Sequence, residues 1–147
     1  MINVGAGYEV VWLVRRLFRA MADTADQYLK DDELTAADRA VMEFLYPEQQ
    51  LSVPAIAAKY RVSRQHVQVT VNKLISRGLI RALANPQHKR SPLMRLSELG
   101  RETFAEIRRN ESVIIEKMFA DLRSEDVDVT RQLLRSLLVR FESGELL

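Results

Sequence analysis

Apolar side chains in this chain recur at steps of three and four residues over long stretches, the pattern of amphipathic helices. The first stretch runs from about Tyr8 to Leu29. Because this spacing places the apolar side chains on one face, the sequence predicts one long helix at the start of the chain. The apolar positions of this helix are Val10, Val11, Val14, Leu17, Phe18, Met21 and Ala25.

Two shorter helices are predicted next from their capping residues. Thr35 is placed to cap a second helix, which Pro47 ends. A third helix is expected over Ser52–Lys59, where Pro54 in the first turn removes no hydrogen bond that the helix needs. The apolar stripe of the second helix consists of Ala40, Val41, Phe44 and Leu45.

A turn at Tyr60–Val62 leads to a fourth helix, which Ser63 caps and Gly78 terminates. Its apolar residues lie at i, i+4 and i+7, so they share the face that packs inward. The positions expected to pack inward around this turn are Ile56, Ala57, Val62, Val67, Val71 and Leu74.

After Gly78 the pattern changes to two short apolar-rich runs, Leu79–Ala84 and Pro92–Leu96, on either side of a polar loop. The loop, Asn85–Ser91, contains a proline, and this arrangement predicts a β-hairpin with an exposed tip. Helix, turn, helix and hairpin in this order predict a winged helix-turn-helix. The expected fold class is therefore mainly α with a small β-hairpin wing.

Two more helices are predicted at the end of the chain. Ser97 caps a long helix to about Leu122, and a final helix follows from Glu125 to about Glu142. The final helix carries more apolar surface than is needed to cover a small domain, so it is expected to be buried either between two subunits or within one. The candidates for an interface between subunits are Val11, Trp12, Phe18, Leu134, Leu137 and Phe141.

Charge is unevenly distributed over the 147 residues. Between Glu48 and Glu98 there is no Asp or Glu, but nine Lys and Arg residues; all 20 carboxylates lie outside this segment. The formal net charge of +2 hides this separation. A basic segment without carboxylates is typical of a surface that binds nucleic acid, and the simpler alternative is a solvated basic face.

The outer face of the fourth helix carries the side chains that read bases in a major groove. Arg, Gln and Asn pair bidentately with guanine or adenine edges. We expect this role for four residues, Arg64, Gln65, Gln68 and Asn72. Val69 is apolar on the same face and is expected to meet a thymine methyl group. For each residue the alternative is an ordinary solvated helix face.

Basic side chains around this helix and at the hairpin tip are expected to contact the DNA backbone. Phosphate contacts are expected from Arg61, Lys73, Arg77 and Lys89, and a minor-groove contact from Lys89 or Arg90. The alternative for the tip is a solvated turn. The full set of expected DNA-binding residues is Arg61, Ser63, Arg64, Gln65, His66, Gln68, Val69, Asn72, Lys73, Arg77, His88, Lys89 and Arg90.

The stretch from Leu51 to Glu102 resembles the multiple-antibiotic-resistance regulator (MarR) family of bacterial transcription factors. The resemblance implies a homodimer whose first and last helices intertwine, with dimerisation helices at 1–34 and 98–147 around a DNA-binding domain at 35–97. The matching features are Val62-Ser63-Arg64, Leu74, Arg77-Gly78-Leu79-Ile80, Asn85-Pro86 with Lys89-Arg90, and Leu96-Ser97 with Gly100-Arg101.

Three positions depart from the pattern of that family. His88 replaces the Asp that usually holds the wing arginine, so the wing is expected to be looser or pH-sensitive. Val69 replaces an Arg of many members, and Arg61 stands where the turn often has Gly. Family members often bind a small aromatic anion, but the sequence identifies no ligand-binding residues here. Plausible wall residues that are more usually core are Trp12, Met42, Phe44 and Tyr46.

Other classes of function are disfavoured by what the sequence lacks. With no cysteine and only two histidines, no metal site, cofactor or enzymatic activity is expected. No signal-peptide or membrane-span pattern is found, and a cytoplasmic location is the expectation. The sequence thus predicts a DNA-binding transcriptional regulator, a repressor acting on a pseudo-palindromic operator. The alternative is a winged-helix module for protein interaction or assembly.

Overall fold

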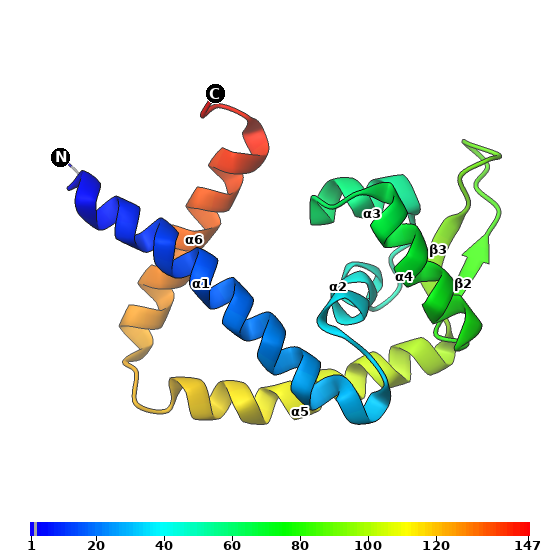
Figure 1. Ribbon diagram of the computed structural model, residues 1–147, viewed down its shortest axis with the longest axis horizontal. Helices are drawn as coiled ribbons and strands as arrows, with labels where there is room; N and C mark the ends of the chain where they lie inside the picture. Colours follow the sequence, from blue (N-terminus) through cyan, green and yellow to red (C-terminus); the bar gives the residue numbers. More distant parts are fainter. Residues whose placement is uncertain (2) are drawn as a thin grey trace. The chain divides into compact units, whose positions relative to one another are not determined.

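The computed structural model describes Met1 and residues 3–147. These residues are mainly helical, with one small antiparallel sheet, which confirms the predicted fold class (Figure 1). The elements in chain order are α1 (Val4–Leu29), the 3-10 helix η1 (Lys30–Asp32), α2 (Ala36–Leu45), β1 (Leu51–Ser52), α3 (Val53–Tyr60), α4 (Arg64–Ser76), β2 (Ile80–Leu83), β3 (Leu93–Leu96), α5 (Glu98–Phe119) and α6 (Ser124–Ser143).

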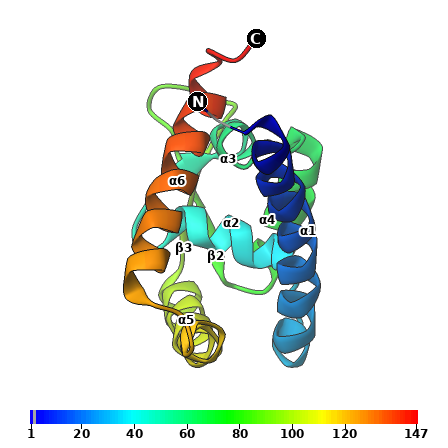
Figure 2. The same cartoon turned by 90° about the vertical axis from the view of Figure 1, so that its left-hand side faces the viewer.

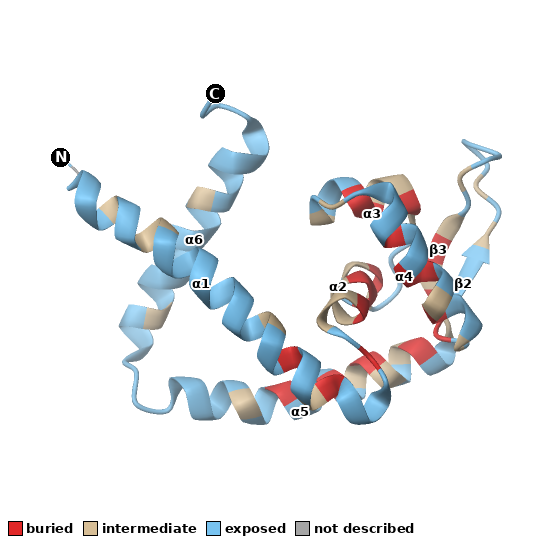
Figure 3. Ribbon diagram, in the orientation of Figure 1, coloured by how far each residue is buried: buried red, intermediate tan, exposed pale blue. Residues whose placement is uncertain are grey.

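The chain divides into two compact units, Met1–Arg108 and Arg109–Leu147. The first unit contains the hydrophobic core, to which the end of α1, α2, α3, α4, the sheet and the start of α5 all contribute (Figure 3). In the second unit, α6 has no buried residue. No helix in the described part of the chain is both long and apolar enough to span a bilayer.

Helix starts follow the predicted capping residues closely. The hydroxyl of Thr35 accepts a hydrogen bond from the backbone N–H of Asp38, whose carboxylate accepts one from the backbone N–H of Thr35. The side chains of Ser52 and Ser63 cap α3 and α4 by accepting one hydrogen bond each, from the backbone N–H of Ala55 and of His66. The start of α1 differs from the expectation of about Tyr8, because the side chain of Asn3 caps the helix at Val4.

Helices α3 and α4 pack as the apolar spacing predicted. Ile56, Val67, Val71 and Leu74 are fully buried. Arg61, between the two helices, adopts a left-handed conformation with φ of 60°, which a glycine would adopt without strain. This backbone geometry explains why glycine suits the turn.

The sheet has the strand order β1-β3-β2, all pairs antiparallel. The hairpin of β2 and β3 was predicted, whereas β1 was not. Its two residues are too few to show an alternating pattern, and they become a strand only because Leu51 lies beside Met94 of the wing.

Large apolar side chains of the terminal helices stay uncovered by the single chain. In Figures 1 and 2, α1 is one continuous helix, and only Ala25 and Leu29 near its end are buried. Trp12 and Phe18 of α1 are 49% and 60% exposed, and Leu134 and Phe141 of α6 are 44% and 56% exposed. Each of these four side chains is thus at least 44% exposed.

Gly100 lies where α5 passes against the turn between α4 and β2. A Cβ atom at this position would overlap the carbonyl oxygen of Leu79, which already accepts a hydrogen bond of 3.0 Å from the backbone N–H of Ser97. We therefore expect Gly100→Ala to lower the free energy of unfolding by about 1–3 kcal/mol, because backbone rather than a mobile side chain must shift. Urea unfolding measures this effect.

The matched control for this substitution is Glu102→Ala, at an exposed position of the same helix. It should change the free energy of unfolding by less than about 0.5 kcal/mol. If Gly100→Ala lowers the free energy of unfolding no more than the control does, α5 does not approach Leu79 as closely as described.

Candidate nucleic-acid interface

The outer face of α4 presents a row of polar side chains to solvent. Arg64, Gln65, His66, Gln68, Val69 and Asn72 are all exposed, whereas Val67 and Val71 beneath them are buried. This sidedness was predicted from the spacing of the apolar residues. Val69 is 64% exposed, an apolar side chain in an otherwise polar row.

The start of α4 is held in place by its own cap and by the helix before it. The hydroxyl of Ser63 accepts a hydrogen bond of 3.0 Å from the backbone N–H of His66. The ring of His66 stacks on that of Tyr60, with centroids 6.5 Å apart. Ser63 therefore orders the helix start, and the imidazole of His66 lies against α3.

Gln68 and Asn72 are joined on the exposed face. The side-chain amide of Gln68 donates a hydrogen bond of 2.8 Å to the side-chain oxygen of Asn72, one helical turn away. This contact leaves the oxygen of Gln68 and the amide of Asn72 to face solvent. Two side chains that can read adenine are thus arranged as a pair.

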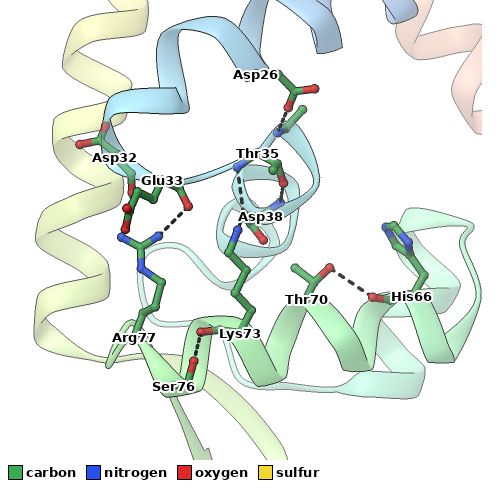
Figure 4. Close-up of polar contacts among 11 residues, drawn as sticks. Asp26, Asp32, Glu33, Thr35, Asp38, His66, Thr70, Lys73, Ser76 and Arg77 are labelled. Atoms are coloured by element: carbon green, nitrogen blue, oxygen red, sulfur yellow. Dashed lines mark hydrogen bonds and ion pairs between the residues drawn. The ribbon is translucent and has the colours of Figure 1, made fainter.

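Lys73 and Arg77 are engaged with another part of the protein (Figure 4). The ammonium of Lys73 donates a hydrogen bond of 2.5 Å to the carboxylate of Asp38, whose side chain is 3% exposed. The guanidinium of Arg77 donates to the carbonyl oxygens of Asp32 and Glu33, at 2.8 and 2.9 Å. Both were expected to hold phosphates, but here they link α4 to the start of α2 and to the segment between α1 and α2.

The wing tip is tied together by Asn85. Its side-chain amide donates to the carbonyl oxygen of Ser91 at 2.9 Å, and its side-chain oxygen accepts from the backbone N–H of Gln87 at 3.1 Å. Lys89 and Arg90 are exposed beyond this tie, as is His88. The contact across the tip was not foreseen, because it joins residues at the two ends of the loop.

A shallow groove of about 300 Å³ brings α4 and the wing together. It places Arg64, Gln65 and Gln68 of the helix beside Arg90 at the base of the wing tip. These residues come from separate elements, and the sequence alone did not show that they share one hollow. The lining residues are Val53, Pro54, Arg64, Gln65, Gln68, Arg90, Ser91, Pro92 and Met94.

Arg81 and Arg95 are two further basic residues that sequence reasoning did not assign to the site. They lie directly opposite each other in the ladder of β2 and β3, and neither forms an ion pair with any described residue. Like charges in such a pair repel each other, so an anion beside them would be favoured. The alternation of side chains along each strand is visible in the sequence, but the pairing of Arg81 with Arg95 follows only from the register of the two strands.

The suggested wall residues of a ligand site fall into two groups. Met42 is completely buried, and Phe44 and Tyr46 pack against the hydrophobic core. The ring of Tyr46 lies 5.0 Å from that of Phe104. These three are core residues, and only Trp12 is exposed.

The sequence matches known proteins over most of the winged helix-turn-helix. Residues 33–91 match a family model described as "MarR family". Uncharacterized proteins of Mycobacterium bovis and Mycobacterium tuberculosis are each 32% identical to the chain over 93 residues, which is 63% of this chain. The chain spans 65% of the length of these relatives.

Solved structures share the fold over nearly the whole chain. The transcriptional regulator BldR from Sulfolobus solfataricus superposes with a TM-score of 0.85 at 18% identity, covering 95% of this chain and 99% of that one. MepR of S. aureus, solved as a complex with DNA, has a TM-score of 0.75 at 20% identity and covers 88% and 96%. At such identities the likeness establishes the fold.

Proposed function

Because residues 33–91 match the MarR family model and the fold is shared with solved winged helix-turn-helix structures, we propose that the chain is a MarR-family transcriptional regulator that binds double-stranded DNA sequence-specifically. The observation that carries the proposal is the shared groove in which Arg64, Gln65 and Gln68 of α4 lie beside Arg90 of the wing. A helix with such side chains fits a major groove, and a basic ribbon beside it reaches the adjacent minor groove.

The proposed roles of the site residues follow their surroundings. Arg64, Gln65 and the linked pair of Gln68 and Asn72 read base edges, and Val69 meets a thymine methyl group. Arg90 enters the minor groove. Phosphates are held by Arg61 and Lys89, together with Arg81 and Arg95 of the wing strands. Lys73 and Arg77 are left out of this set, because Asp38 and two backbone carbonyls already engage them.

A homodimer is the form in which this protein would read a pseudo-palindromic operator. Its interface would consist of the exposed apolar faces of α1, α5 and α6, of which Phe18 and Leu134 are examples. Two reading helices related by a two-fold axis match half-sites about one helical turn apart. We further propose that the protein represses transcription in the cytoplasm. A small aromatic effector would bind more tightly at one separation of the two reading helices than at another.

The experiment that tests the proposal is selection and sequencing of the duplexes that the purified protein retains from a random pool. One enriched, two-fold symmetric sequence is expected. On that operator Gln68→Ala should lose about 1–3 kcal/mol of binding free energy, with little loss on random DNA, because Gln68 is proposed to read a base. Arg90→Ala should weaken both duplexes alike. Fluorescence anisotropy with labelled DNA measures the affinities of the wild-type protein and of both variants for the two duplexes.

The pair of Gln68 and Asn72 supplies a control within this experiment. Because their side chains are hydrogen-bonded, the losses from Gln68→Ala and Asn72→Ala should not add in the double variant. Retention of no preferred sequence, together with undiminished binding to partner proteins after Arg64→Ala and Arg90→Ala, would instead support an interaction module.

A further inference from the structure

Two cations at the C-terminal end of the reading helix α4, Lys73 and Arg77, form contacts within the protein. Lys73 and Arg77 lie one helical turn apart; Lys73 reaches Asp38 at the start of α2, and Arg77 reaches the segment between α1 and α2 (Figure 4). None of the residues in these contacts lines the groove that is proposed to face DNA. The position of these contacts suggests that they determine how α4 is oriented.

The first link joins α4 to the start of α2 through Asp38. One oxygen of this carboxylate accepts hydrogen bonds from the ammonium of Lys73 at 2.5 Å and from the backbone N–H of Thr35 at 2.8 Å. Asp38 is only 2% exposed, so water cannot readily replace the ammonium. A buried carboxylate that loses its cation is strongly disfavoured, which makes the contact persistent.

The second link joins α4 to the end of α1. The guanidinium of Arg77 donates hydrogen bonds to the carbonyl oxygens of Asp32, in the 3-10 helix η1 that follows α1, and of Glu33 just after it. On the other side of this turn, the carboxylate of Asp26 in α1 accepts a hydrogen bond of 2.6 Å from the backbone N–H of Ala36. The end of α1, the start of α2 and the second half of α4 are thus tied to one another.

We propose that Lys73, Asp38 and Arg77 are positioning residues that set the angle of the reading helix from the end of α1. The inference rests on the proposed DNA binding. Because α1 is also a proposed dimerisation helix, the dimer would determine through these links how each reading helix meets its half-site. The alternative for Lys73 and Arg77 is direct contact with phosphates.

Asp38→Asn separates the two roles by the sign of its effect. It removes a negative charge near the reading helix, so charge alone would strengthen DNA binding. The asparagine oxygen still accepts the Thr35 hydrogen bond, and the helix cap is kept. If Lys73 positions α4, the loss of its charged partner should weaken operator binding about 3- to 30-fold.

Arg77→Lys is a second variant that preserves charge. A lysine ammonium still holds a phosphate, but it cannot bridge two carbonyl oxygens as the planar guanidinium does. Operator affinity should fall by a similar factor, whereas affinity for random duplex should change less than about twofold. Lys73→Met should follow Asp38→Asn without reducing the salt dependence of binding, and Lys73→Arg should retain affinity.

Hydrogen–deuterium exchange provides a readout that needs no DNA. In Asp38→Asn and Arg77→Lys, amides of residues 70–77 and of residues 30–38 should both exchange faster, because each segment loses its hold on the other. Failure of the wild-type protein to bind any duplex would remove the proposed function, and exchange would still decide whether the links couple the segments.

Several results overturn the inference. They are unchanged exchange in both segments, operator affinity of Asp38→Asn equal to or above wild type, or a salt dependence reduced by about one phosphate per protomer in Lys73→Met. Thermal unfolding of each variant shows whether a lost affinity reflects a lost fold. If it does, the operator affinity of Lys73→Arg, which keeps a cation at this position, is compared with that of the wild-type protein instead.

Discussion

Operator affinity is expected to fall about 10³- to 10⁵-fold when the salt concentration rises from 50 to 200 mM. Arg61, Arg64, Lys89 and Arg90 are all exposed, and roughly three to five cations per protomer give about 6–10 phosphate contacts in a dimer. Each contact releases counterions from the duplex, so binding weakens steeply as salt is added. Anisotropy titrations of a labelled operator at several salt concentrations give the slope.

Single substitutions test which cations produce this slope. Lys89→Ala should reduce it by about one per protomer on operator and random duplex alike. The matched control is Lys117→Ala, an exposed cation of α5 outside the basic segment, which should leave the slope unchanged. A flat response of the wild-type protein to salt would contradict the proposed interface, whatever the affinity.

Phe104→Ala is expected to lower the free energy of unfolding by about 3–5 kcal/mol. Phe104 is among the largest fully buried side chains, at 1% exposure, and joins the start of α5 to the hydrophobic core. Its ring packs 5.0 Å from that of Tyr46, and the guanidinium of Arg39 lies 5.6 Å from its centroid. Truncation removes these contacts and leaves a cavity. Urea unfolding at one fixed protein concentration measures the loss.

Leu99→Ala serves as the matched control for this substitution. Leu99 lies on the same helix but is 53% exposed, so its truncation should change the free energy of unfolding by about 0.5 kcal/mol or less. Equal effects of the two substitutions would mean that the start of α5 does not pack on the hydrophobic core as described.

Much of the fold was predictable because its signals are local. Thr35, Ser52 and Ser63 each satisfy N–H groups within three residues, so the helix starts could be read directly. The early start of α1 was missed because Asn3 lies before the apolar stripe begins. The strand β1 was missed because its existence depends on a distant partner.

The candidate site was predicted in part, for the same reason. The exposed row on α4 follows from helical spacing, so Arg64, Gln68 and Asn72 were correctly expected on the outer face. Arg81 and Arg95 were counted as charges, but their direct opposition required the register of the hairpin. The groove shared with Arg90 likewise required both elements to be in place.

By itself the sequence determined the helices with their caps, the hairpin, the solvent-exposed face of α4, and the basic segment without carboxylates. Each of these depends on neighbours within a few residues, where spacing alone sets direction. Only the tertiary structure decided that Lys73 and Arg77 bind other segments of the protein. Their partners lie 35 residues away at Asp38, and 44 and 45 residues away at Glu33 and Asp32. Such contacts form only when folding brings distant segments together, and once Asp38 is buried, loss of Lys73 would leave its carboxylate without a cation away from water.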